Sequence, residues 1–222
     1  MRSTKHIALV VVFAVAMAWL ESASVAYLRT LVHRIEPYQI SPLPMGHSFD
    51  LTELVREGAT IIMLIAVGWL AGKSWKSRLG CFLVAFGVWD IFYYLFLKII
   101  VGWPHTLFDW DVLFLIPVPW WGPVLAPMLI AAVFILLGAM MTDSEFNGWR
   151  FNPSTISWGS HGLGIAIALF VFMENSISIL LHGGARVHEL LPAEFNWPLF
   201  GLALVLMMLP ITEAGISHLK KK

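Results

Sequence analysis

The sequence predicts an all-α membrane protein, a bundle of about six transmembrane helices. Hydrophobic residues make up 59% of the 222 residues and charged residues only 13%, whereas about a quarter of an average soluble domain is charged. Six segments are apolar over about 20 residues each, the length that crosses the hydrocarbon core of a bilayer. We therefore expect a single transmembrane domain over residues 1–222.

The six predicted spans alternate with polar or proline-containing connections. They are His6–Leu28, Leu51–Ala71, Leu79–Val101, Trp121–Met141, Gly159–Leu181 and Asn196–Ser217. The first span follows two basic residues and contains a Ser-Ala-Ser sequence at 22–24, a pattern that also fits a signal peptide. Its apolar character continues through Leu28, so we expect it to be retained as a span.

Basic residues are divided unequally between the two sides of a six-span chain. Nine lie on the side of the termini: Arg2, Lys5, Lys73, Lys76, Arg78, Arg150, Lys220, Lys221 and Lys222. The other side holds Arg29, Arg34, Arg56 and Arg186, with Lys98 near it. Because cytoplasmic loops are enriched in Lys and Arg, both termini are predicted to be cytoplasmic. The expected location is the plasma (inner) membrane.

Small residues indicate where helices pack closely. They recur at every fourth position from Ala14 to Ala26, and Gly68 and Gly72 form a GxxxG pair in the second span. Such rows let helix backbones approach one another in lipid. Internal packing is the favoured interpretation, and a dimer seam is the alternative.

The second predicted outer loop is apolar, broken by prolines and rich in tryptophan. It extends from Gly102 to Pro123 and contains no Lys or Arg. Irregular backbone at membrane depth persists only where protein or a water-filled cavity satisfies its polar groups. We expect this loop to be a lid over a site enclosed by the spans. The alternative is a plain linker with aromatic anchors.

Four carboxylates fall inside the predicted spans, at Glu21, Glu57, Asp90 and Glu174. Ionisable groups are expensive in hydrocarbon and usually mark functional positions. With a rise of about 1.5 Å per residue, Asp90 lies about 16 Å from the cytoplasmic surface and the other three about 21–22 Å from it. We therefore expect a shared polar layer in the outer half of the bilayer.

Acids outnumber cations in this layer, so protonated carboxylates or a bound cation are expected. The candidate catalytic residues are Glu21, Asp90, Glu174, Tyr93 and Tyr94. The candidate substrate-binding residues are Arg56, Glu57, Lys98, Trp110 and Arg29. A divalent metal ion is a candidate cofactor, with Asp90, Asp111 and His105 as ligands, because carboxylate and imidazole together suit zinc. The structural alternative pairs Arg56 with Glu21 or Glu174.

Three functional classes fit this pattern. An enzyme that acts on a lipid or isoprenoid-like substrate by acid–base or metal-assisted chemistry is favoured. The alternatives are an accessory subunit of a membrane complex and a small proton-coupled transporter. The expected partner is membrane lipid, with a homodimer or a membrane complex also considered. Nucleic acid is not expected, because the formal net charge is zero.

Overall fold

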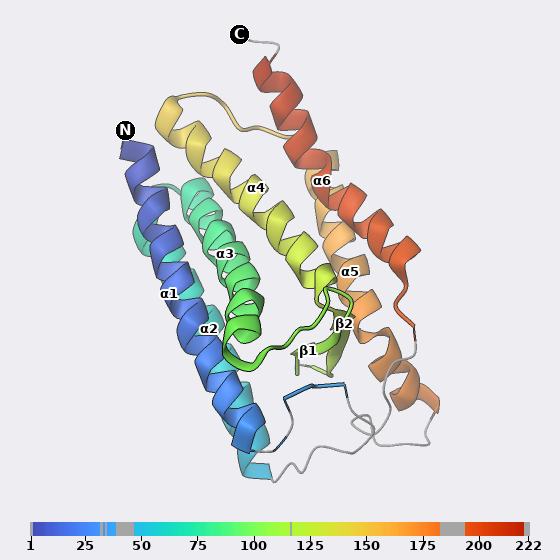
Figure 1. Ribbon diagram of the computed structural model, residues 1–222. Coiled ribbons are helices and arrows are strands. Elements are labelled where there is room, and N and C mark those ends of the chain that lie inside the picture. The colour runs from blue at the N-terminus through green and yellow to red at the C-terminus, as the bar shows by residue number, and fades with distance from the viewer. Residues whose placement is uncertain are drawn as a thin grey trace.

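The computed structural model describes residues 2–31, 33, 35–38, 47–115, 117–182 and 194–219. Six long helices and one small antiparallel hairpin make up this part of the chain (Figure 1). The helices are α1 (Arg2–Leu31), α2 (His47–Ala71), α3 (Trp75–Val101), α4 (Leu125–Asn147), α5 (Thr155–His182) and α6 (Trp197–Leu219). The strands are β1 (Trp110–Phe114) and β2 (Trp120–Pro123).

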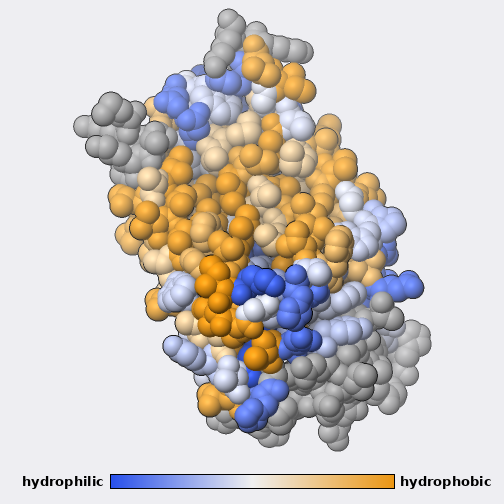
Figure 2. Space-filling view, viewed as in Figure 1, coloured by the Kyte–Doolittle hydropathy of each residue, from blue (hydrophilic) through white to orange (hydrophobic). Residues whose placement is uncertain are grey.

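All six helices are long and apolar enough to cross a membrane, which confirms the predicted fold class and identifies an integral membrane protein. A hydrophobic belt crosses the middle of the visible face, and hydrophilic residues gather towards its two ends (Figure 2). The start of α1 and the end of α6 lie at one end of the bundle, and the hairpin lies towards the other (Figure 1). Which end faces the cytoplasm stays a prediction, and Arg34, Arg186 and Lys220–Lys222 lie outside the described residues.

Helix α3 lies at the centre of the packing, since α1, α2 and α4 all contact it, while α5 packs on α6. Close approach of α3 and α4 depends on glycine. A Cβ atom on Gly138 would lie 2.4 Å from the carbonyl oxygen of Gly80, and one on Gly87 would lie 2.5 Å from that of Ala131. The helix–helix contact therefore needs these small residues.

The small-residue rows found in the sequence also contribute to internal contacts. Ala14 and Ser22 of α1 are fully buried, and the Ser22 hydroxyl donates to the Tyr93 carbonyl oxygen of α3 at 2.9 Å. A Cβ atom on Gly68 would meet the backbone of Phe82 in α3 at 2.8 Å. Internal packing, the favoured interpretation of both rows, agrees with these contacts.

Several helix boundaries differ from the predicted ones, and two of these differences have a local cause. Helix α3 begins at Trp75 rather than Leu79, because Ser74 and Ser77 form a reciprocal capping box that starts the helix inside a polar segment. Helix α4 begins at Leu125 rather than Trp121, and residues 120–123 form β2 instead. Pro123 disfavours helical backbone at the residue before it, so the apolar run starts as a strand.

Candidate functional site

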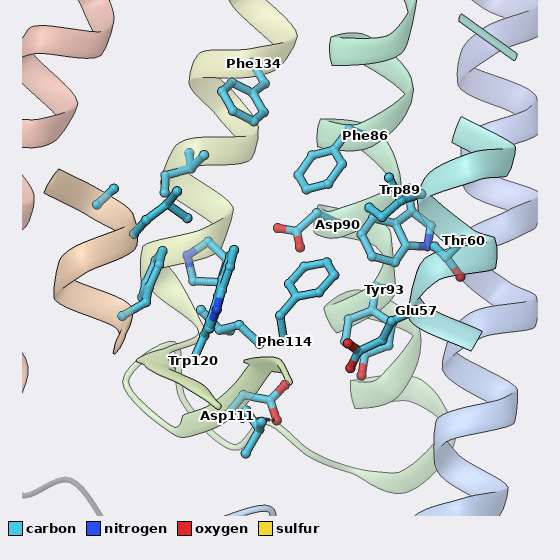
Figure 3. A pocket seen from close by; sticks show the side chains of 18 of the residues that line it. Glu57, Thr60, Phe86, Trp89, Asp90, Tyr93, Asp111, Phe114, Trp120 and Phe134 are labelled. Carbon is cyan, nitrogen blue, oxygen red and sulfur yellow. Dashed lines mark hydrogen bonds between the residues drawn. The ribbon is translucent and has the colours of Figure 1, made fainter. Parts of the chain in front are cut away.

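A cavity of about 420 Å³ lies inside the bundle, and all six helices and the hairpin contribute side chains to it. Helices α3 and α4 border it on two sides, with α5 beyond α4 and α2 beyond α3 in the close view (Figure 3). The hairpin borders one end through residues 111–114 and Trp120. The Trp- and Pro-rich segment therefore bounds the cavity as an ordered hairpin, where the sequence led us to expect irregular backbone.

The hairpin is anchored to several helices by specific contacts. The Ser176 hydroxyl of α5 donates to the Pro119 carbonyl oxygen at 2.6 Å. The Leu115 N–H donates to Glu57 Oε2 of α2 at 3.3 Å. Gly122 lies against Phe172 of α5, where a Cβ atom would come within 2.9 Å of the ring. These contacts fix the position of the wall that the hairpin gives to the cavity.

Asp111 of β1 ties the hairpin to α1. Its Oδ1 lies 2.9 Å from Nη2 of Arg29, and the residue is 1% exposed. The guanidinium of Arg29 also lies 4.5 Å from the ring centroid of Trp103, a cation–π geometry. Burial raises the pKa of Asp111 above its usual value, against the opposing effect of the Arg29 charge and the Val112 N–H.

Glu21 of α1 is held by an ion pair with Arg56 of α2. The Thr60 hydroxyl donates to Glu21 Oε2 at 3.1 Å, and Arg56 also pairs with Glu53 at 2.7 Å. The structural alternative drawn from the sequence, in which Arg56 pairs with Glu21, agrees with this contact. Glu21 therefore has a cationic partner within the protein, which it shares with Glu53.

Asp90 of α3 is different, because its carboxyl group projects into the middle of the cavity (Figure 3). Its Oδ2 atom is buried and has no hydrogen-bond partner within the described part of the chain. Leaving a buried polar atom unpaired is unfavourable. This atom is thus available to a ligand or a proton.

Aromatic rings surround Asp90. Phe86 lies 5.6 Å from Trp89 and 5.8 Å from Phe134, measured between ring centroids. On the hairpin, the corresponding distance from Phe114 to Trp120 is 5.2 Å. The indole nitrogens of Trp89 and Trp120 are buried and, like Asp90 Oδ2, lack a partner among the described residues.

Seven of the residues predicted from the sequence line this cavity. They are Glu21, Arg56, Glu57, Asp90, Tyr93, Tyr94 and Asp111. The structure thus places Glu21, Glu57 and Asp90, from three separate helices, in the lining of one cavity. Arg29 stands behind the wall, bound to Asp111.

The structure does not bring Glu174, Lys98 or Trp110 to the cavity. Glu174 is half-buried on α5 and is not a lining residue. Lys98 is exposed and donates to the Gly102 carbonyl oxygen at 3.1 Å. Trp110 stacks on Tyr38 at a centroid distance of 5.9 Å.

The candidate metal ligands are not gathered together. The exposed His105 pairs with Glu36 at 3.1 Å, so it does not join Asp90 and Asp111 at the cavity. No group of three His, Cys, Asp or Glu side chains suited to a metal ion occurs in the described ranges.

The sequence reasoning overlooked the aromatic lining. Phe86 lies one helical turn before Asp90, at the i, i+4 spacing that places two side chains on one face, so it could have been inferred. Trp120 and Phe114 come from the hairpin, and no local pattern places them opposite α3. Comparisons of the chain with protein-family models, with curated proteins and with solved structures find no match.

Proposed function

We propose that the protein is a membrane-embedded enzyme that acts on a lipid or isoprenoid-like substrate in the cavity by acid–base chemistry. The observation that carries the proposal is the Asp90 Oδ2 atom, which has no partner in the described ranges of the chain and lies in a cavity lined mainly by apolar and aromatic side chains. A cavity of about 420 Å³ is within the range of small-molecule sites, roughly 300–1,000 Å³.

Asp90 is the residue that we assign as general acid or base. Glu21 is neutralised by Arg56, and Asp111 is neutralised by Arg29, so these acids are committed to holding the walls. Proton transfer needs a carboxyl group that can reach the substrate and that changes its protonation state. The Asp90 carboxyl group projects into the cavity, where a bound substrate can reach it. Tyr93 and Tyr94 follow it on α3 and also line the cavity, where we assign them to orient the reacting group.

The apolar part of the lining accounts for the lipid-like substrate. The lining includes the aliphatic or thioether side chains of Ile130 of α4, Ile165 and Leu169 of α5, and Met207 of α6. Burying a hydrocarbon chain against such side chains stabilises binding by about 25 cal/mol per Å² of apolar surface. Because the cavity lies between spanning helices, a substrate dissolved in the bilayer has no water layer to cross.

The test is a turnover assay in nanodiscs made from a total lipid extract of the expression host. After incubation, mass spectrometry compares the wild type with Asp90→Asn. We expect one lipid species to be consumed by the wild type and conversion to fall at least about 100-fold in the variant. Asp143→Asn on α4 is the matched control, because Asp143 bonds Asn147 and Trp149 outside the cavity, and it is expected to convert lipid at the wild-type rate.

Equal conversion by Asp90→Asn and the wild type would contradict the assignment of Asp90. Absence of conversion, combined with pH-gradient-driven uptake of a solute into vesicles that depends on Asp90, would replace the enzyme by a proton-coupled transporter.

A further inference from the structure

We propose that the ligand of this cavity is an amphipathic cation, a molecule with a protonated amine or quaternary ammonium head and a hydrocarbon tail, whose head binds beside Asp90. The inference rests on the proposed function in that it names the class of substrate for the same site.

The balance of charge in the lining is the first argument. Within the described ranges, four carboxylates and one arginine line the cavity: Glu21, Glu57, Asp90, Asp111 and Arg56. Arg56 pairs with Glu21, and Arg29 from behind the wall pairs with Asp111. Glu57 receives a backbone N–H from Leu115, and Asp90 Oδ2 receives nothing from the described residues. The lining thus carries more carboxylates than cations, and an ionised carboxylate away from water needs a positive partner.

The aromatic rings are the second and independent argument. Phe86 and Phe114 lie on opposite sides of the Asp90 carboxyl group in the close view, and Trp89 and Trp120 flank it (Figure 3). The faces of aromatic rings carry negative charge density and attract cations, most strongly for tryptophan. Rings of this kind around a carboxylate are a suitable environment for an ammonium group, which is large and weakly hydrated when it is alkylated.

Other ligand classes fit less well. An anionic head would meet the uncompensated carboxylates. A purely hydrocarbon ligand would leave Asp90 Oδ2 and the Trp120 indole N–H, both buried, without partners. A protonated amine donates to Oδ2, whereas a quaternary ammonium has no N–H and compensates the charge of Asp90 without a hydrogen bond. In a ligand that carries one, an adjacent ether, ester or hydroxyl oxygen accepts from the Trp120 N–H. The tail then lies against Ile130 and Ile165.

The experiment measures binding of matched decyl probes to the protein in a nonionic maltoside detergent. Thermal unfolding is followed as a function of probe concentration, because a ligand of the folded state raises the unfolding temperature by an amount that grows with the logarithm of its concentration relative to its Kd. The probes are decyltrimethylammonium, decanol and decanoate, with tetramethylammonium as the head without a tail. We expect decyltrimethylammonium to bind at least about tenfold more tightly than the other three.

Two variants relate this selectivity to the site. Asp90→Asn is expected to remove the preference for the cation and to lower its affinity by about tenfold or more, while Asp143→Asn keeps both. Trp120→Leu is expected to weaken decyltrimethylammonium more than decanol. The unfolding temperature without a probe establishes that each variant is folded.

Equal binding of decyltrimethylammonium and decanoate would overturn the inference, as would unchanged selectivity in folded Asp90→Asn. Binding of tetramethylammonium as tight as that of decyltrimethylammonium would also overturn it, since the site would then take a small free cation. Selective cation binding without lipid conversion in nanodiscs would leave the inference standing and end the proposed enzyme function. Conversion of a lipid without an amine would support the proposed enzyme function and overturn the inference about its substrate.

Discussion

Arg29 and Asp111 form the buried ion pair that joins α1 to the hairpin. Arg29 Nη2 lies 2.9 Å from Asp111 Oδ1, and the side chains of Arg29 and Asp111 are 13% and 2% exposed. Desolvation makes such a pair an uncertain source of net stability, yet removal of one partner leaves a charge buried without compensation. The pair therefore has more influence on where the hairpin lies than on how stable the bundle is.

Replacement of Arg29 by leucine is expected to destabilise the protein by about 3–5 kcal/mol, because Asp111 would stay buried without its cation. Asp111→Asn removes the charge that needs compensation. The double variant should therefore be more stable than Arg29→Leu alone. Unfolding in mixed micelles measures the four species of this cycle. Additive effects of the two changes would show that the pair is not coupled.

Asp109 stabilises the turn before β1 through two short hydrogen bonds. Its carboxylate accepts from the His105 N–H and from the Thr106 hydroxyl, both at 2.7 Å. Partial burial acts to raise the pKa of Asp109, but these hydrogen bonds outweigh it and hold the pKa below the usual value of 3.8. A lowered pKa means that the ionised form stabilises the folded state.

The stabilisation from Asp109 should be complete well above pH 3.8 and should be lost as the pH falls through its lower folded-state value. Amide hydrogen exchange at His105 reports it directly. We expect Asp109→Asn to raise that exchange rate near neutral pH and to differ less from the wild type as the pH falls. A difference that stays constant between neutral and acidic pH would contradict this account.

At the scale of elements, glycines decide how closely α3 and α4 approach. Gly80 and Gly138 face each other so tightly that a Cβ atom on either would lie within 2.8 Å of the other's carbonyl oxygen. Both helices also line the cavity, with Asp90 on α3 and Ile130 on α4. Close packing here therefore supports the site from a distance.

Gly138→Ala is expected to cost about 1–3 kcal/mol, the usual range for overpacking a close contact. Gly201→Ala in α6 is the matched control, because nothing lies within 4 Å of the Cβ position there. Alanine also has the higher helix propensity, by roughly 1 kcal/mol in soluble helices. Gly138→Ala should therefore lower the unfolding temperature, and Gly201→Ala should leave it unchanged or raise it. Equal effects at both positions would argue against a tight α3–α4 contact.

For the whole molecule, the predicted orientation places the hairpin on the extracytoplasmic side and both termini in the cytoplasm. Leu107, close to the hairpin, is 46% exposed, and Asn152 is exposed in the connection between α4 and α5. Native Cys81 is 1% exposed, so it contributes little labelling. A membrane-impermeant maleimide on intact cells should label Leu107→Cys and leave Asn152→Cys unlabelled until the cells are opened. The reverse pattern would invert the orientation.

Local composition was sufficient to predict the spans, and depth arithmetic was sufficient to group Glu21, Glu57 and Asp90. It failed for Glu174, which lies at a similar predicted depth but does not line the cavity. Depth follows from position along a helix, whereas the direction of a side chain depends on the rotation of that helix about its axis. Neighbouring helices set this rotation, so no count along the chain contains it.

The amino-acid sequence by itself determined that this protein crosses a membrane, about where it does so, and that its spans contain carboxylates. Hydrophobicity and length act locally, residue by residue, so they can be read in order along the chain. Only the tertiary structure decided that Arg56 and Arg29 pair with Glu21 and Asp111, and that Asp90 Oδ2 has no hydrogen-bond partner among the described residues. These pairings depend on the distances between elements that are far apart in the sequence, and the packing of the helices sets those distances.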